Sequence, residues 1–137
     1  MVTLWLAVDD STPENGCLRV IPGSHRLAFQ EHTKNTDVAN VLSSGIAAVD
    51  ESRAVDIVLK AGDVSVHHPN LIHGSDANTS DRRRCGLTIR YIPTSTRITK
   101  PIGAPFLLRG QPVVGINTYI ERPEYIAGEH FPFRDAA

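Results

Sequence analysis

The most restrictive feature of the sequence is an alternating segment at residues 84–91. One side of its extended chain is apolar and the other is polar or small: Cys85, Leu87, Ile89 and Tyr91 against Arg84, Gly86, Thr88 and Arg90. Because successive side chains of a β-strand point to opposite faces, this segment predicts a strand. An inward face with arginine, glycine and threonine would make a poor hydrophobic core but a good anion site.

Four further segments, at residues 2–8, 17–21, 54–59 and 63–68, are also predicted to be strands, separated by turn signals. In one of these turns, the pair Asn15-Gly16 suits a backbone at positive φ. Residues 27–50 lack a clear period and are predicted to be a solvated insertion. Six of the nine prolines lie at or beyond Pro93 and predict an irregular tail. Together these segments predict one all-β domain over residues 1–137.

Composition excludes several classes of function. With 14 basic and 15 acidic residues the net charge is −1, so neither nucleic acid nor an anionic membrane is an expected partner. No apolar run approaches the roughly 20 residues of a transmembrane helix. The apolar start lacks a basic segment and is read as a strand rather than a signal peptide. Cys17 and Cys85 form no disulfide framework, so a cytoplasmic location is expected.

Three residues, His73 and Ser75 in the loop after residues 63–68 and Arg84 at the start of the strand at residues 84–91, suit a metal and anion pocket. His73 is a candidate metal ligand, because neutral imidazole binds Fe(II) well. Arg84 could pair with the distal carboxylate of a 2-oxo acid, which a planar guanidinium matches. Ser75 could add a hydroxyl hydrogen bond, and Gly86 would leave room for the cosubstrate. The alternatives are a structural histidine and a solvated arginine cluster.

Two motifs, LWLAVDDSTPENGCLRVIPGSHR and GDVSVHHPNLIHGSDANTSDRRRCGLTIRYIP, resemble the phytanoyl-CoA dioxygenase family of Fe(II)- and 2-oxoglutarate-dependent oxygenases. The resemblance implies a double-stranded β-helix, a jelly-roll barrel of the cupin kind, that hydroxylates a small-molecule substrate. By position, His73 resembles the distal iron ligand, Ser75 the hydroxyl that helps hold 2-oxoglutarate, and Arg84 the arginine on its distal carboxylate. His68-Pro69 is expected to pack behind the ligand, and residues 5–25 to form pocket wall.

The chain departs from the family at the other two iron ligands. The family takes them from a His-x-Asp motif that precedes the strand at residues 4–8. The residues two positions after the six histidines are not acidic: Leu27, Lys34, Pro69, Asn70, Ser75 and Pro132. The expectation is therefore the C-terminal part of a longer family member, a barrel incomplete at its N-terminus, inactive by itself and weak in binding Fe(II).

Two other hypotheses remain open. A catalytically inactive jelly-roll fragment could serve as a binding or structural module, and its exposed sheet edges would favour a homo-oligomer. A cupin-like metal isomerase would need several histidines in one strand motif. His67-His68 is the hint of such a motif, but alternation points these two side chains to opposite faces.

Overall fold

The structure is a computed structural model that describes residues 1–28, 33–34, 44–46, 49–99, 105–122, 124 and 126. The chain forms two compact units, Met1–Tyr91 and Ile92–Ala137. The described strands lie in the first unit: β1 Val2–Ala7, β2 Leu18–Val20, β3 Thr33–Lys34, β4 Ser44–Gly45, β5 Val55–Ile57, β6 Val64–His67, β7 His73–Gly74 and β8 Gly86–Tyr91. Three short 3-10 helices accompany them: η1 Pro13–Asn15, η2 Ser24–Arg26 and η3 Glu51–Arg53.

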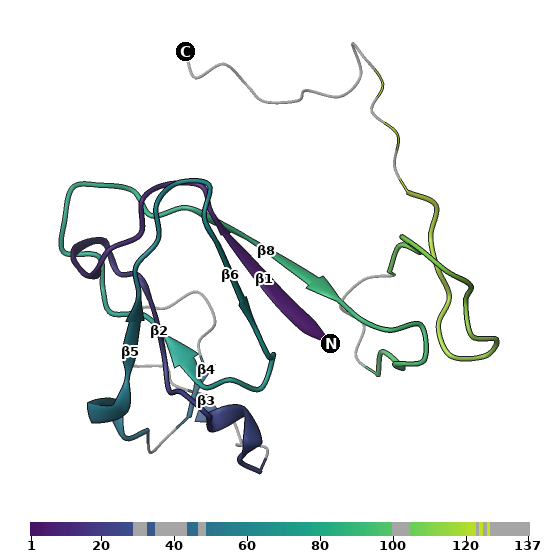
Figure 1. Ribbon diagram of the computed structural model, residues 1–137, viewed down its shortest axis with the longest axis horizontal. Helices are drawn as coiled ribbons and strands as arrows, with labels where there is room; N and C mark the ends of the chain where they lie inside the picture. The colour runs from purple at the N-terminus through teal and green to yellow at the C-terminus, as the bar shows by residue number, and fades with distance from the viewer. Residues whose placement is uncertain are drawn as a thin grey trace. The chain divides into compact units, whose positions relative to one another are not determined.

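The strands form two antiparallel three-stranded sheets and one small pair. The first sheet has the order β6-β1-β8 and the second β5-β2-β7, while β3 pairs with β4 (Figure 1). The all-β prediction is therefore confirmed, and all five predicted strands are present within a residue or two of their expected ends. Two features differ from the prediction. His73 lies in a two-residue strand, and the insertion at residues 27–50 contains the β3-β4 pair.

Strand β1 organises the first sheet because it pairs along both edges. Its burial alternates, with Thr3, Trp5 and Ala7 buried on one face. The register places polar or small residues beside each of them, in three rows across the sheet: His67, Thr3 and Arg90; Ser65, Trp5 and Thr88; Ala7 and Gly86. The inward face of β8 is thus the one with arginine, glycine and threonine, as its alternation predicts.

The opposite face of the first sheet is apolar and open to solvent. It carries Val2, Leu4, Leu6, Val64, Val66, Leu87, Ile89 and Tyr91. Val66 is 62% exposed and Leu87 is 51% exposed. The sheet therefore turns its polar side toward the second sheet and its apolar side outward, which is the reverse of an ordinary two-layer sandwich.

The buried core of the first unit is small and partly polar. Its buried apolar side chains are Trp5, Ala7, Cys17, Val20 and Ile21, and its buried polar ones are Thr3, Ser11, Asn15 and Ser24. Asn15 is only 1% exposed, and its amide bonds the Thr12 N–H and the Asp10 carbonyl, each at 2.7 Å. The next residue, Gly16, has φ 74°, so the positive φ predicted for Asn15-Gly16 is confirmed.

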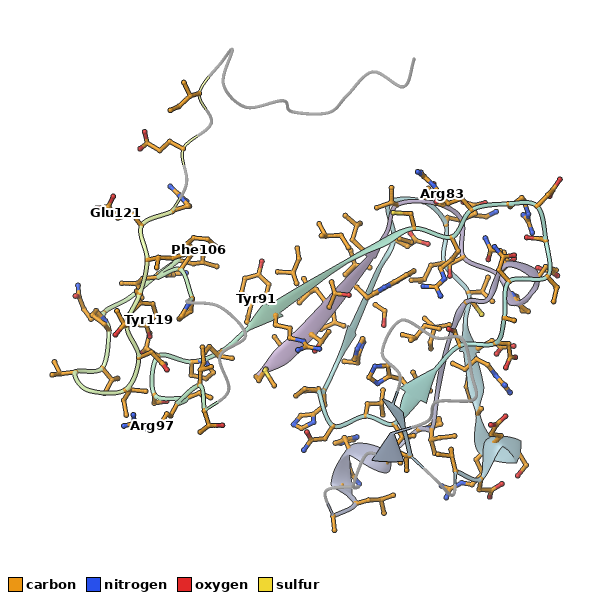
Figure 2. All side chains as sticks on the ribbon, turned by 180° about the vertical axis from the view of Figure 1, so that it is seen from behind. Arg83, Tyr91, Arg97, Phe106, Tyr119 and Glu121 are labelled. Carbon is orange, nitrogen blue, oxygen red and sulfur yellow. The ribbon has the colours of Figure 1, made fainter. Side chains whose placement is uncertain are left out.

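The second unit has little regular structure in its described part, as the prolines predict. Phe106 and Ile120 form an isolated parallel bridge. The Arg97 guanidinium donates to the Gly115 carbonyl at 2.9 Å, and the Asn117 side chain accepts from the Ile98 N–H at 2.9 Å. These contacts bring residues 96–98 beside residues 115–117 and Phe106 beside Ile120, as the positions of Arg97, Phe106 and Tyr119 show (Figure 2). Among the described residues, no helix has the length and hydropathy needed to cross a membrane.

The contact between Gly86 and Trp5 yields a test of the fold. A Cβ at Gly86 would lie 2.8 Å from Trp5 Nε1 and closer still to two ring carbons. We expect Gly86→Ala to lower the free energy of unfolding by about 1–3 kcal/mol, because an overpacked buried contact must rearrange.

Urea denaturation measures this change. Gly74→Ala is the matched control, since a Cβ there would have no heavy atom within 4 Å apart from those of its chain neighbours. Equal unfolding midpoints for the two variants would contradict the packing described for Trp5.

Candidate functional site

The structure brings two of the three predicted site residues into contact, between the two sheets. His73 belongs to β7 of the second sheet, opposite Val20, and Ser75 follows two residues later. Arg84 lies two residues before the start of β8 in the first sheet. Its Nη2 is 3.4 Å from Ser75 Oγ. The structure therefore brings Ser75 and Arg84 into contact, with His73 on the same stretch of chain.

His73 is held in the tautomer that suits a metal ligand. Its Nδ1 lies 2.6 Å from the Leu71 carbonyl oxygen. Because a carbonyl only accepts, Nδ1 carries the proton and donates it, which leaves the Nε2 lone pair free in the neutral ring. Metal-binding histidines commonly have this arrangement, in which a backbone carbonyl fixes the ring orientation. The side chain is exposed and so accessible.

The three consecutive arginines have different partners. Arg83 donates to both carboxylate oxygens of Asp9, at 2.9 Å each. Arg82 donates to the Thr12 hydroxyl at 3.3 Å and lies 3.8 Å from the Glu14 carboxylate. Arg84 has no carboxylate partner among the described residues. Its guanidinium carbon lies 5.9 Å from the centroid of the Trp5 ring, so Trp5 supports one face and leaves the N–H groups for an anion.

Asp9 anchors this arrangement. The hydrogen bond from Arg83 is the largest cause that lowers the pKa of Asp9 below its usual 3.8, and a bond from the Cys85 N–H also lowers it. The same carboxylate therefore holds the Arg83 side chain and the backbone at the start of β8. The buried Asn15 amide adds a contact to the Arg83 carbonyl at 3.4 Å. With Arg83 held by Asp9, Arg84 is the arginine that contacts Ser75 and the Trp5 ring.

The structure adds His67, which the sequence analysis considered only as part of a cupin-like His67-His68 motif. His67 is half-buried on the inward face of β6, and its ring centroid lies 5.7 Å from that of His73. Burial, and then the neighbouring His73 and Arg90, lower the pKa of His67 below 6.5. The sequence signal that could have found it was the alternation of residues 63–68. It places His67 on the face of the strand that does not carry the apolar Val64 and Val66.

Gly86 does not have the role expected from the sequence. Its missing side chain was expected to leave room for a cosubstrate. The space beside Gly86 is instead filled by the Trp5 indole, which a Cβ at this position would overlap. Gly86 thus allows Trp5 to lie across the first sheet, under Arg84.

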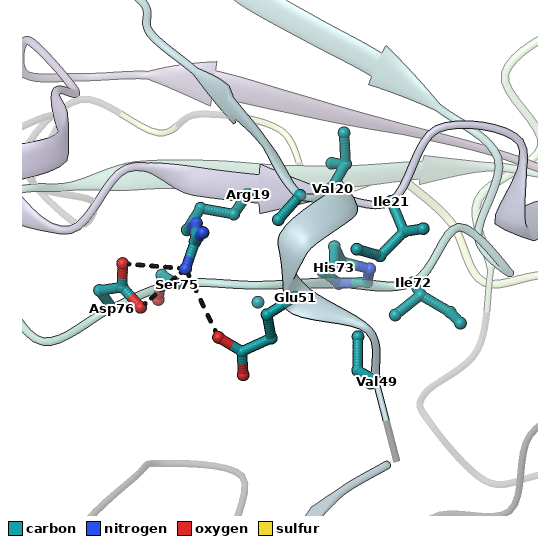
Figure 3. Close-up of a pocket in the computed structure, with 11 residues that line it drawn as sticks. Arg19, Val20, Ile21, Val49, Glu51, Ile72, His73, Ser75 and Asp76 are labelled. Atoms are coloured by element: carbon teal, nitrogen blue, oxygen red, sulfur yellow. Dashed lines mark hydrogen bonds and ion pairs between the residues drawn. The ribbon is translucent and has the colours of Figure 1, made fainter. Parts of the chain in front are cut away.

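A cavity of about 210 Å³ borders the candidate site on the second sheet, and His73 and Ser75 are among its lining residues (Figure 3). Arg19 lies at one side of it, with carboxylates of Asp56 and Asp76 at 3.1 Å and of Glu51 at 3.7 Å. These carboxylates, Asp76 first, raise the pKa of Arg19. The ion pairs tie β2 to β5, to η3 and to the residue after Ser75, and sequence analysis did not find them.

The residues present fit 2-oxoglutarate better than they fit iron. Arg84 and Ser75 provide a free guanidinium and a hydroxyl in contact with each other. For the metal, His73 provides one well-oriented imidazole. Within the described part of the chain, no group of three or more His, Cys, Asp or Glu side chains could hold a metal ion.

The ion pair of Asp9 gives a pH-dependent test of the arginine arrangement. The lowered pKa of Asp9 means that the unfolded chain binds its proton more readily than the folded chain. Its stabilising contribution is therefore present above pH 3.8 and is lost as the pH falls through the folded-state pKa. We expect Asp9→Asn to destabilise the protein clearly at pH 7 and less at pH 3.

Urea denaturation at both pH values checks this expectation. Asp81→Asn removes a charge at an exposed side chain with no hydrogen bond or ion pair to the described residues, and serves as the control. If Asp9→Asn lowered stability equally at the two pH values, the charge of Asp9 would have no part in the clamp.

The chain is similar to several known proteins. A family model described as Phytanoyl-CoA dioxygenase (PhyH) matches residues 1–86. "Phytanoyl-CoA dioxygenase 1" of Oryza sativa subsp. japonica is 35% identical over 91 residues, covering 66% of this chain and 32% of that protein. "L-proline trans-4-hydroxylase" of Streptomyces griseoviridis is 31% identical over 134 residues, covering 85% of this chain and 50% of that protein.

Solved structures extend the likeness to three dimensions. The non-heme monooxygenase ThoJ in its apo form matches with a TM-score of 0.71 and 33% identity, over 90% of this chain and 44% of that chain. EvdO2 from Micromonospora carbonacea var. aurantiaca, complexed with 2-oxoglutarate, matches with a TM-score of 0.56 and 28% identity, over 64% of this chain and 36% of that chain. The expected jelly-roll fold is confirmed. The chain spans half or less of the length of these relatives.

Proposed function

Because the chain belongs to the phytanoyl-CoA dioxygenase (PhyH) family, we propose that it carries the cosubstrate clamp and one iron ligand of an Fe(II)- and 2-oxoglutarate-dependent dioxygenase that hydroxylates a small molecule. The observation that carries this proposal is that the Arg84 guanidinium has no acidic partner among the described residues. The two arginines before it have such partners, and Arg84 contacts Ser75 beside His73.

The chain's own residues have separate roles in this proposal. Arg84 pairs with the distal carboxylate of 2-oxoglutarate, and Ser75 donates its hydroxyl to the same group. Trp5 covers one face of the guanidinium and excludes water there. His73 offers Nε2 to the metal. Bound Fe(II) and 2-oxoglutarate would supply the oxidative decarboxylation that is coupled to hydroxylation. One imidazole without a carboxylate holds Fe(II) weakly, since affinity depends on the number and type of ligands.

Arg84 is the residue to test. We expect Arg84→Ala to weaken 2-oxoglutarate binding by at least about tenfold, because a charge-assisted hydrogen-bonded pair is worth more than about 1.4 kcal/mol. Isothermal titration calorimetry on the 137-residue chain measures the affinity.

Arg82→Ala is the matched control. It removes the same charge two residues before Arg84, from a side chain that is paired with Glu14. It should bind 2-oxoglutarate almost as the unchanged chain does. Equal affinities for the unchanged chain and Arg84→Ala would remove Arg84 from the proposed clamp.

A second candidate function is a catalytically inactive binding or structural module. Two observations favour it. A complete jelly roll has eight strands, whereas the two sheets described here have three each. Strands β8 and β7 are edge strands of the first and second sheet. The outward face of the first sheet is also apolar and exposed. Both features favour pairing with another chain, including a second copy.

Self-association tests this second candidate. We expect light scattering to show dimers or larger species whose fraction rises with concentration. Leu87→Lys should reduce association, because a charge on an edge strand opposes strand pairing. Val58→Lys is the control, at a site 56% exposed outside both sheets. A monomer at every concentration would contradict the module hypothesis.

A further inference from the structure

Two histidines from different sheets face each other beside the proposed clamp. His67 lies on β6 opposite Thr3, and His73 lies on β7 opposite Val20. Their ring centroids are 5.7 Å apart, with the rings inclined by 49°. The sheets, rather than the local sequence, bring the pair together, since each residue is held by its own strand pairing.

The distance suits a shared metal ion. Imidazole nitrogens bind metals such as zinc at about 2.0–2.1 Å, so two rings that hold one ion through Nε2 have centroids less than about 6.5 Å apart. The observed 5.7 Å lies within this limit. His73 is exposed and His67 is half-buried, so the space between them is reachable from solvent.

The hydrogen bond of His73 leaves its Nε2 available, and that of His67 is compatible with the same tautomer. His73 donates Nδ1–H to the Leu71 carbonyl. His67 Nδ1 lies 3.2 Å from Ser65 Oγ, a hydroxyl that can accept from it. Each ring thus has a polar partner at Nδ1, which is the usual support of a histidine ligand.

A second histidine pair in the same unit has the opposite arrangement. The rings of His25 and His68 have centroids 5.6 Å apart. His68 Nδ1, however, accepts a hydrogen bond from the Asn70 backbone N–H at 3.1 Å. In the neutral ring the proton of His68 is therefore on Nε2, which then has no lone pair for a metal. Proximity alone does not make a site, and this pair serves as a comparison.

We propose that His67 and His73 form a two-histidine site for a divalent transition metal, with His67 as a ligand supplied by β6. The inference rests on the proposed role of His73 as a metal ligand and adds a second donor that is not part of a His-x-Asp motif. Two imidazoles without a carboxylate favour Ni²⁺, Cu²⁺ and Zn²⁺ over Fe²⁺, following the general order of affinities. The site binds these ions in the chain as it stands.

Calorimetric titration of the 137-residue chain with Ni²⁺ tests the proposal. We expect one ion per chain. His67→Gln and His73→Gln should each weaken binding by at least the roughly 10- to 100-fold that loss of a supporting partner costs. His68→Gln should bind as the unchanged chain does. Urea denaturation of each variant without metal establishes that it is folded, and Ni²⁺ should broaden the imidazole NMR signals of His67 and His73 selectively.

The outcomes separate this inference from the proposed function. If His67→Gln bound Ni²⁺ as tightly as the unchanged chain while His73→Gln did not, the two-histidine site would be wrong and the role of His73 would stand. Equal loss in His68→Gln would also overturn it, as non-specific binding to histidines. The proposed clamp is judged independently, by the effect of Arg84→Ala on 2-oxoglutarate binding.

Discussion

The pairing of β1 along both of its edges is the constraint on which the rest of the site depends. Antiparallel register with β6 and β8 puts Thr3, Trp5 and Ala7 in rows with polar or small residues of the neighbouring strands. Each row faces the second sheet, where β7 presents His73. The site is therefore a property of the sheet register, and no single loop creates it.

Much of the fold and part of the site could be predicted from the sequence. The alternation of residues 84–91 predicted β8 and the direction of its polar face. The two motifs identified His73, Ser75 and Arg84, and the structure brings the last two into contact. Strand β7 was missed because two residues, His73 and Gly74, show no alternation, although they pair with Arg19 and Val20.

Long-range partners account for the rest of what the sequence did not reveal. Nothing in the local sequence of RRR distinguishes its members. Asp9, which is 74 positions before Arg83, binds Arg83 and leaves Arg84 to contact Ser75. In the same way, Trp5 fills the space beside Gly86, and His67 meets His73 through contacts between sheets. Such choices depend on tertiary packing and are not encoded in spacing.

The three bonds that the Asp9 carboxylate accepts, two from the Arg83 side chain and one from the Cys85 N–H, also fix where β8 begins. A strand with one polar and one apolar face has two self-consistent placements that differ by a single residue. In the other placement Cys85, Leu87 and Ile89 would line the space between the sheets. Residues 84–91 could thus line either an anion site or a dry hydrocarbon core. The Asp9 carboxylate at the start of the strand selects between these two placements.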